Sequence, residues 1–200
     1  MNILFSHPTS PAYLSKGLFA DEDLLKQCVR DTDLQLEQRP PVIIYGKVCK
    51  QPRNVGFFSN VSDGYRYAKN TMVSKPLTPA LSELLQSINR VIGSDFNGIL
   101  INKYNDGNDY ICAHSDDETK LDANGVVSIS YGSERIFRIR DKVTKQIICD
   151  EPTTHCCILH MGGDFQKLYT HEIPVQKKIK EPRFSFTFRK HIQSTATTPA

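Results

Sequence analysis

The sequence lacks any hydrophobic run long enough to cross a membrane, for which roughly eighteen consecutive apolar residues are needed. Its first residues also lack the basic segment and long apolar stretch of a secretory signal. We therefore expect a soluble intracellular protein with no membrane association, and the sequence does not choose between nucleus and cytoplasm. No internal repeat and no heptad pattern are present, so we expect a monomer.

The spacing of the cysteines argues against two further classes of protein, zinc ribbons and disulfide-stabilised folds. The six cysteines include no C-x-x-C pair, which a zinc ribbon would need, and two of them are adjacent, unlike those of a disulfide framework. Reduced thiols are expected inside a cell. The 200 residues, 39% of them hydrophobic, suffice for one domain with a substantial core. The net charge of +3 permits a polyanionic partner without requiring one.

The C-terminal half favours a mainly β fold with flanking helices. Short β-rich runs separated by turn signals follow one another with no helix between them, which is typical of a jelly roll. We divide the single domain into an extension over residues 1–97, a core over 98–192 and a flexible polar tail over 193–200. The expected strands are 98–104, 110–116, 126–131, 135–140, 146–149, 155–160, 168–173 and 183–190.

The extension is predicted to hold two helices and a hairpin. Residues 1–17 contain two prolines and a glycine, which indicate an irregular arm. Asp21 can cap a short helix, and Thr78 begins the clearest helix of the chain, with proline at its first position and glycine beyond its end. The run 42–49 is typical of a hairpin with Tyr45 at its tip.

The segment 65–69 interleaves aromatic and basic side chains. This pattern is typical of an edge strand with one buried face. It is also typical of a surface that stacks bases and neutralises phosphates. Both interpretations stay open on the pattern alone.

The strand expected at 110–116 ends in a histidine and a carboxylate two residues apart. Side chains two apart in an extended chain share a face, so His114 and Asp116 point the same way. One imidazole and one carboxylate, joined by a distant second imidazole, form the facial triad that suits Fe(II) and leaves positions open for other ligands. The alternative is a solvated acidic turn beside a histidine.

A third ligand would have to come from one of the other histidines. His171 follows a strand-like run and is far from His114 in sequence, as closure of a barrel over the site would allow. His160 is its rival, because it lies in the apolar run 156–161. The pattern favours His171 without excluding His160. The remaining candidates are His7, His155 and His191.

The last expected strand alternates polar and aromatic side chains, with three phenylalanines on one face. Its other face holds Arg183, Ser185, Thr187 and Arg189. Two inward cations are costly unless anions meet them. A strand of this length spans roughly 20 Å, so the two arginines could bind both ends of a small dicarboxylate. The alternative is an edge strand with its polar face in water.

Taken in order, these motifs resemble those of the AlkB-like Fe(II)/2-oxoglutarate dioxygenases. The likeness is greatest to the second and third human AlkB homologues, which remove methyl groups from nucleobases by oxidation. It extends over roughly residues 40–191. One position departs from the family pattern, which has asparagine midway between the two arginines where this chain has Ser185. The matching segments are 102–107, 114–118, 161–166, 171–174 and 183–189.

The resemblance implies a double-stranded β-helix core that uses Fe(II), 2-oxoglutarate and O2. It implies that His114, Asp116 and His171 hold the iron, in preference to His160. Binding of 2-oxoglutarate is implied for Arg183 and Arg189, aided by Asn102, Tyr104 and Thr187. The extension would then carry the substrate-recognition hairpin and scaffold helices.

The resemblance also implies a nucleic-acid substrate, DNA or RNA, and demethylation of 1-methyladenine and 3-methylcytosine with release of formaldehyde and succinate. The hairpin tip would fill the gap that the flipped base leaves in a duplex, and carboxylates would face a cationic base. One alternative is an oxygenase for another RNA mark or a protein. A second is a catalytically silent nucleic-acid-binding module, against which the intact triad and arginines argue. The implied substrate contacts are Tyr45, Arg53, Tyr65, Tyr67, Asp117 and Glu118.

Overall fold

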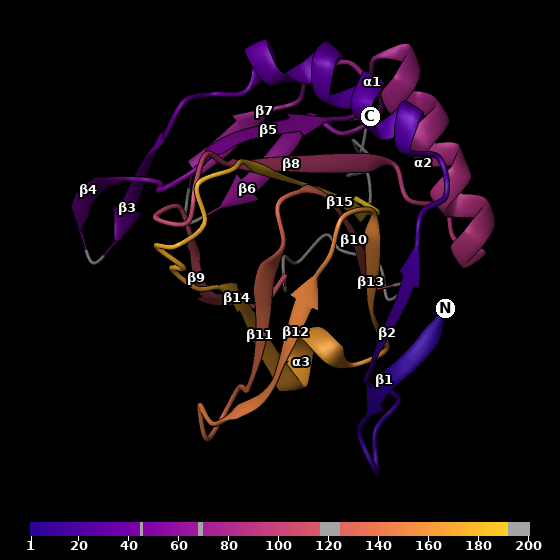
Figure 1. Cartoon of the computed structure of the whole chain (residues 1–200), viewed down its shortest axis with the longest axis vertical. Helices are drawn as coiled ribbons and strands as arrows, with labels where there is room; N and C mark the ends of the chain where they lie inside the picture. The colour runs from indigo at the N-terminus through magenta and orange to yellow at the C-terminus, as the bar shows by residue number, and fades with distance from the viewer. Residues whose placement is uncertain (45, 68–69, 117–124, 192–200) are drawn as a thin grey trace, which may run out of the picture.

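The computed structural model describes residues 1–44, 46–67, 70–116 and 125–191, and in these ranges the chain forms two facing β-sheets (Figure 1). The larger sheet has seven strands, and every neighbouring pair is antiparallel. Its order across the sheet is β1 (Asn2–Ser6), β2 (Tyr13–Leu18), β13 (Cys157–Gly162), β10 (Val126–Gly132), β15 (Arg183–Arg189), β8 (Gly98–Tyr104) and β5 (Asn54–Phe58).

The smaller sheet has four antiparallel strands in the order β12 (Ile147–Thr153), β11 (Arg135–Asp141), β14 (Tyr169–Ile173) and β9 (Ile111–His114). All eight strands expected after residue 97 are present, with ends shifted by a few residues. The mainly β core is therefore confirmed. A one-turn helix, α3 (Phe165–Leu168), lies between β13 and β14; it was not predicted, because four residues are too few to show a helical period.

The predicted irregular arm over residues 1–17 is wrong. These residues form β1 and β2, and β2 pairs along its length with β13, so the partner that makes this segment a strand lies about 140 residues further along the chain. Local sequence carries no sign of such a partner. The boundary at residue 98 stays a prediction, although β1, β2 and β5 from before it lie in one sheet with the strands that follow.

Both predicted helices of the extension are confirmed. α1 (Glu22–Thr32) is capped by Asp21, whose side chain accepts from the Leu24 N–H at 2.9 Å. α2 (Pro79–Ile92) is capped by Thr78 and ends at Gly93, which has a φ of 70°. A 3-10 helix, η1 (Asp33–Gln35), follows α1. No helix within the described ranges is both long and apolar enough to cross a membrane.

The two long helices cover the outer face of the larger sheet (Figure 1). Their leucines pack on the three phenylalanines of β15, and each such buried side chain contributes roughly 1.5–3 kcal/mol to stability. Because neighbouring side chains in a strand face opposite ways, the polar side of β15 must then face the space between the sheets. The packed residues include Leu81, Leu84, Leu85, Phe184, Phe186 and Phe188.

Two hairpins complete the extension. The predicted hairpin over 42–49 is confirmed as β3 (Pro41–Ile44) and β4 (Lys47–Lys50), and it projects from one edge of the molecule (Figure 1). Gly46 has a φ of 77° in its turn, which favours glycine. β6 (Gly64–Tyr67) pairs with β7 (Asn70–Val73) in the second hairpin. The predicted tip residue, Tyr45, lies outside the described residues.

Candidate active site

The two histidines that the resemblance selects lie directly opposite each other on neighbouring strands of the smaller sheet. His114 ends β9 and pairs in register with His171 on β14, and their ring centroids are 4.4 Å apart. Asp116 follows β9, with one carboxylate oxygen 3.9 Å from Nε2 of His114 and the other 3.6 Å from Nε2 of His171. One donor atom from each residue therefore lies within 4.8 Å of the others. This is the donor set that a facial triad requires.

The hydrogen bond made by His114 Nδ1 determines which ring nitrogen carries the proton and which carries a lone pair. Its Nδ1 is 2.9 Å from the carbonyl oxygen of Cys112, which can only accept, so Nδ1 carries the proton. Nε2 then presents its lone pair toward Asp116, as in metal-ligating histidines whose other nitrogen donates to a carbonyl. The ring of His171 stacks on Phe137, with centroids 5.1 Å apart.

Both imidazoles are held neutral. Burial is the largest of the effects that lower the pKa of His171 to about 3; His114 and Arg189 also lower this pKa, and Asp116 raises it. Burial also lowers the pKa of His114. Neutral imidazole is the form that binds a metal. Both side chains are therefore ready to coordinate at neutral pH.

Asp116 stays ionised although it is buried. Burial by itself would raise the pKa of this carboxyl, but the Arg189 guanidinium and the two imidazoles outweigh that effect and lower the pKa to about 2. Arg189, itself buried, donates from Nη2 to Asp116 Oδ1 at 2.9 Å. A contact of Arg189 with the predicted metal ligand was not expected from the sequence.

Arg183 lies on the same wall with part of its hydrogen-bonding capacity unused. Its Nη2 donates to the Ser130 hydroxyl at 2.8 Å, and its guanidinium lies over the ring of Tyr104. Its Nε and Nη1 are buried and make no hydrogen bond to any described residue. Because a buried cation with unsatisfied donors is costly, these two groups fit a carboxylate bound in the fork of the guanidinium. A dicarboxylate such as 2-oxoglutarate would supply it.

Most of the predicted site residues line one cavity between the sheets. Its described cations, Arg53, Arg183 and Arg189, outnumber its one carboxylate, Asp116, which suits an anionic ligand. Ser185 also lines this cavity, and the predicted residues on its walls are Arg53, Tyr65, Asn102, Tyr104, His114, Asp116, His171, Arg183, Thr187 and Arg189.

Two residues expected on the substrate side lie beside the expected cosubstrate residues. Arg53 is buried and donates from Nε to Asn102 Oδ1 at 2.7 Å. Tyr65 is also buried, with the Arg189 guanidinium 4.7 Å above its ring centroid. The other substrate-side predictions, Tyr45, Asp117, Glu118 and the side chain of Tyr67, lie outside the described residues.

The sequence pattern of the 2OG-Fe(II) oxygenase superfamily matches residues 11–189. The chain belongs to this superfamily. Membership confirms the predicted enzyme class, an Fe(II)/2-oxoglutarate-dependent dioxygenase, and the predicted cofactors Fe(II), 2-oxoglutarate and O2.

Similar proteins place the chain within the AlkB-like group of this superfamily, as predicted. It is 32% identical over 157 residues to the DNA oxidative demethylase ALKBH2 of Homo sapiens, a match that covers 74% of this chain and 60% of the relative. It is 31% identical over 150 residues to the alpha-ketoglutarate-dependent dioxygenase alkB homolog 3 of Homo sapiens, covering 70% and 52%. The chain thus spans between about half and 60% of the length of these relatives.

A solved structure, titled "The structure of OsALKBH1", shares the fold. Its TM-score is 0.58, its sequence identity is 16%, and the match covers 92% of this chain and 100% of the other. The jelly-roll prediction is confirmed by this likeness.

His160, the rival for the third ligand position in this AlkB-like chain, lies elsewhere. It is on β13 directly before Met161, which lines the cavity, so its side chain points to the other face of the sheet. There its ring meets the ring of Tyr13, with centroids 5.3 Å apart. The preference for His171 over His160 agrees with this geometry.

Three polar residues near the cavity were missed. Ser128 and Ser130, two apart on β10, face β15, and the Ser128 hydroxyl is 2.9 Å from that of Ser185. Ser185, where the family pattern has asparagine, is thus hydrogen-bonded within the cavity wall. The alternation of Ser128 and Ser130 with valine and isoleucine was a usable signal. Gln166 on α3 carried no such signal.

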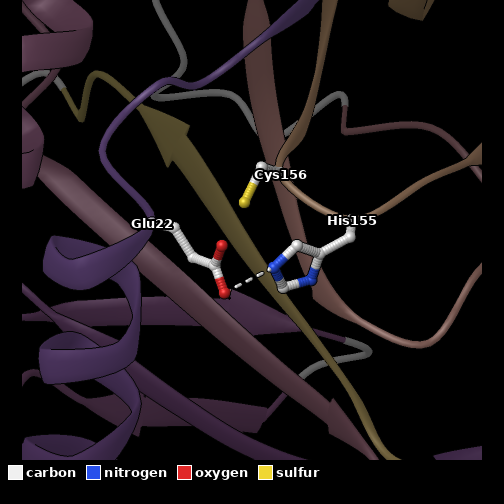
Figure 2. Close-up of side chains that lie close together, drawn as sticks. All are labelled: Glu22, His155 and Cys156. Atoms are coloured by element: carbon white, nitrogen blue, oxygen red, sulfur yellow. Dashed lines mark ion pairs between the residues drawn. The ribbon is translucent and has the colours of Figure 1, made fainter.

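A second group of potential metal ligands lies on the outside of the larger sheet, where the side chains of Glu22, His155 and Cys156 converge (Figure 2). His155 Nε2 is 3.1 Å from Glu22 Oε1. However, the Gly132 N–H donates to His155 Nδ1 at 3.0 Å, so the ring proton must be on Nε2, where Glu22 accepts it. Burial also raises the pKa of the Cys156 thiol. Neither the His155 imidazole, with its proton on Nε2, nor the protonated Cys156 thiol is in the form that binds a metal.

Proposed function

We propose that this protein is an oxidative N-demethylase of nucleobases in DNA or RNA, acting on 1-methyladenine and 3-methylcytosine. The observation that carries the proposal is the neutral histidine pair and ionised Asp116 facing Arg183, with its two unused donors, across one cavity. The names of the relatives add the substrate class, because they include a DNA oxidative demethylase.

In this proposal His114, Asp116 and His171 hold Fe(II), which with 2-oxoglutarate and O2 supplies the oxidation of a carbon–hydrogen bond. Arg183 binds the distal carboxylate of 2-oxoglutarate, while Tyr104 packs against its guanidinium. Arg189 holds Asp116 in place and adds positive charge for the proximal carboxylate. Asn102 and Thr187 complete the polar wall.

The overall reaction balances without a further reagent. One oxygen atom of O2 converts the N-methyl group of the cationic base to N-hydroxymethyl, which leaves as formaldehyde with release of one proton and restores the neutral ring nitrogen of adenine or cytosine. The other oxygen atom enters succinate as 2-oxoglutarate loses CO2. The role of the protein is to orient the methyl group and to exclude competing reactions.

Substrate contacts are proposed for the six residues that the resemblance implies. Tyr45 at the β3–β4 turn would fill the gap left by a flipped base, which offsets part of an unstacking cost of a few kcal/mol. Tyr65 and Tyr67 would contact the base, and Arg53 would meet the substrate from the cavity wall. The carboxylates Asp117 and Glu118 would favour a cationic methylated base over its neutral parent.

Formaldehyde and succinate release tests the proposal. The Fe(II)-loaded protein is given 2-oxoglutarate and matched DNA and RNA oligonucleotides carrying 1-methyladenine or 3-methylcytosine, each single-stranded and duplexed. Turnover on at least one substrate is expected, and His160→Ala should retain it because that side chain points away from the cavity. Tyr45→Ala should lose more activity on duplex than on single strands. Succinate release with no formaldehyde from any oligonucleotide would refute the demethylase while keeping the oxygenase.

A further inference from the structure

Asp116 lies beyond the end of its strand. β9 ends at His114, and its pairs with β14 are at Ile111 and His114. Two hydrogen bonds from other elements hold the next two residues. The Ser115 hydroxyl donates to the Tyr169 carbonyl at 2.8 Å, and the Asp116 N–H donates to Oε1 of Gln166 at 2.9 Å. The main chain of this predicted iron ligand is thus held by a side chain of α3.

Gln166 is oriented by contacts at both ends of its amide. The Asp116 N–H can only donate, so the amide oxygen must face it and Nε2 must face the other way. There Nε2 donates to Sδ of Met161 at 3.4 Å. In addition, the main-chain carbonyl of Gln166 accepts a hydrogen bond from Lys142 Nζ at 3.1 Å. Gln166 therefore links Asp116 to β13, a strand of the opposite sheet.

We infer that Gln166 is a positioning residue for the metal site. The Arg189 guanidinium attracts Oδ1 of Asp116, the oxygen that also lies nearest His114, so it competes with a metal ion for that carboxylate. The hydrogen bond that the Asp116 N–H donates to Gln166 Oε1 holds the Asp116 main chain in the position from which its carboxylate faces the two histidines. Without it, the carboxylate would turn toward Arg189 and be less available to a metal. The inference rests on the proposed role of Asp116 as a ligand.

The test is the affinity for Mn(II), measured by calorimetric titration of the whole protein in the presence of 2-oxoglutarate, with no turnover needed. Gln166→Met removes the acceptor at nearly constant length, and outer-shell losses of this kind weaken metal binding by about 10–100-fold. Gln166→Glu keeps an acceptor oxygen and should bind Mn(II) nearly as well as the parent. Lys167→Ala, on the same helix with a side chain 79% exposed, is the matched control and should bind unchanged.

The outcomes are distinguishable. If the parent protein binds no Mn(II), the proposed metal site fails and not the positioning role alone. If the parent binds and Gln166→Met binds equally well, the positioning role is overturned, even when the thermal stability of the metal-free variant is reduced. An equal loss in Gln166→Met and Gln166→Glu would also overturn it, since the acceptor would then not be the cause.

Discussion

The two groups of potential metal ligands among the described residues differ in one hydrogen bond to a histidine ring. In the cluster of His114, Asp116 and His171, a carbonyl accepts the proton of His114 Nδ1, so Nε2 carries the lone pair that a metal ion would use. In the cluster of Glu22, His155 and Cys156, an amide N–H donates to His155 Nδ1 and forces the proton onto Nε2. The two histidines therefore have opposite tautomers: the proton is on Nδ1 of His114 and on Nε2 of His155. The partner of the second ring nitrogen decides which cluster can bind a metal.

The clusters also differ in their surroundings. The first lies in a cavity with buried arginines, while the second presents Glu22 and His155 to solvent, with side chains 61% and 41% exposed. Water can solvate the exposed Glu22 carboxylate at little cost, so its hydrogen bond with His155 contributes little to stability. In the first cluster Asp116 and His171 are buried, so water does not solvate them to the same extent. A bound metal ion would stabilise the buried Asp116 carboxylate.

The largest expected effect is on metal binding. Asp116→Asn removes the charged ligand but keeps an oxygen that can accept from Arg189, so the fold should persist while Mn(II) affinity falls by more than about 100-fold, beyond the usual outer-shell range. Glu22→Gln is the control and should leave affinity and a stoichiometry of one ion unchanged. Titration calorimetry measures both. A second ion lost in Glu22→Gln would show that the outer cluster binds metal after all.

A smaller effect is expected on the concentration of 2-oxoglutarate that the protein requires. Arg183→Met removes two donors to a carboxylate, each worth about 1.5–3 kcal/mol, so the concentration of 2-oxoglutarate at half-maximal succinate release should rise about 100-fold or more. The thermal stability without cosubstrate should change little, because the loss of the Nη2 hydrogen bond to Ser130 is offset by removal of a buried cation with two unsatisfied donors. Arg138→Met removes a cation paired with Asp150 on the surface and should leave the requirement unchanged. An unchanged requirement in Arg183→Met would exclude this arginine from cosubstrate binding.

The smallest effect concerns stability against pH in the metal-free protein. The pKa of His171 is lowered from 6.5 to about 3, so the unfolded chain binds a proton between these values and the folded chain does not. Stability should therefore be full above pH 6.5 and fall below it, by about 1.4 kcal/mol per pH unit for this imidazole. Urea unfolding at pH 7, 6 and 5 measures the slope. His155→Asn should keep it and His171→Asn should reduce it; equal slopes in both variants would contradict the assignment.

Much of the fold could be predicted because it depends on local pattern. The alternation in residues 183–189 predicted both the phenylalanine face under the helices and the polar face in the cavity. The capping residues Asp21 and Thr78 predicted both helix starts. By contrast, β1 and β2 could not be predicted, because residues 1–17 become extended only through pairing that ends on β13.

The site divides in the same way. The sequence suggested His114 and Asp116 from an extended strand over 110–116, but β9 ends at His114, so strand geometry alone does not place Asp116. The pattern left His171 and His160 both open, and the family resemblance was needed to choose. Gln166 was missed because it acts on the main chain of Asp116, and no spacing in the sequence records such a contact. Contacts that join distant segments through a backbone group are the ones that a sequence alone does not reveal.

The place of β15 in the larger sheet has a consequence for how the protein is made. This final described strand lies between β10 and β8, which are synthesised much earlier. Until Arg183–Arg189 has emerged from the ribosome, the nascent chain exposes the unpaired edges of both strands and an uncovered apolar helix face, which are sites for misassociation. The protein should therefore need chaperone protection during translation, and folding should become possible only when nearly the whole catalytic core has been synthesised.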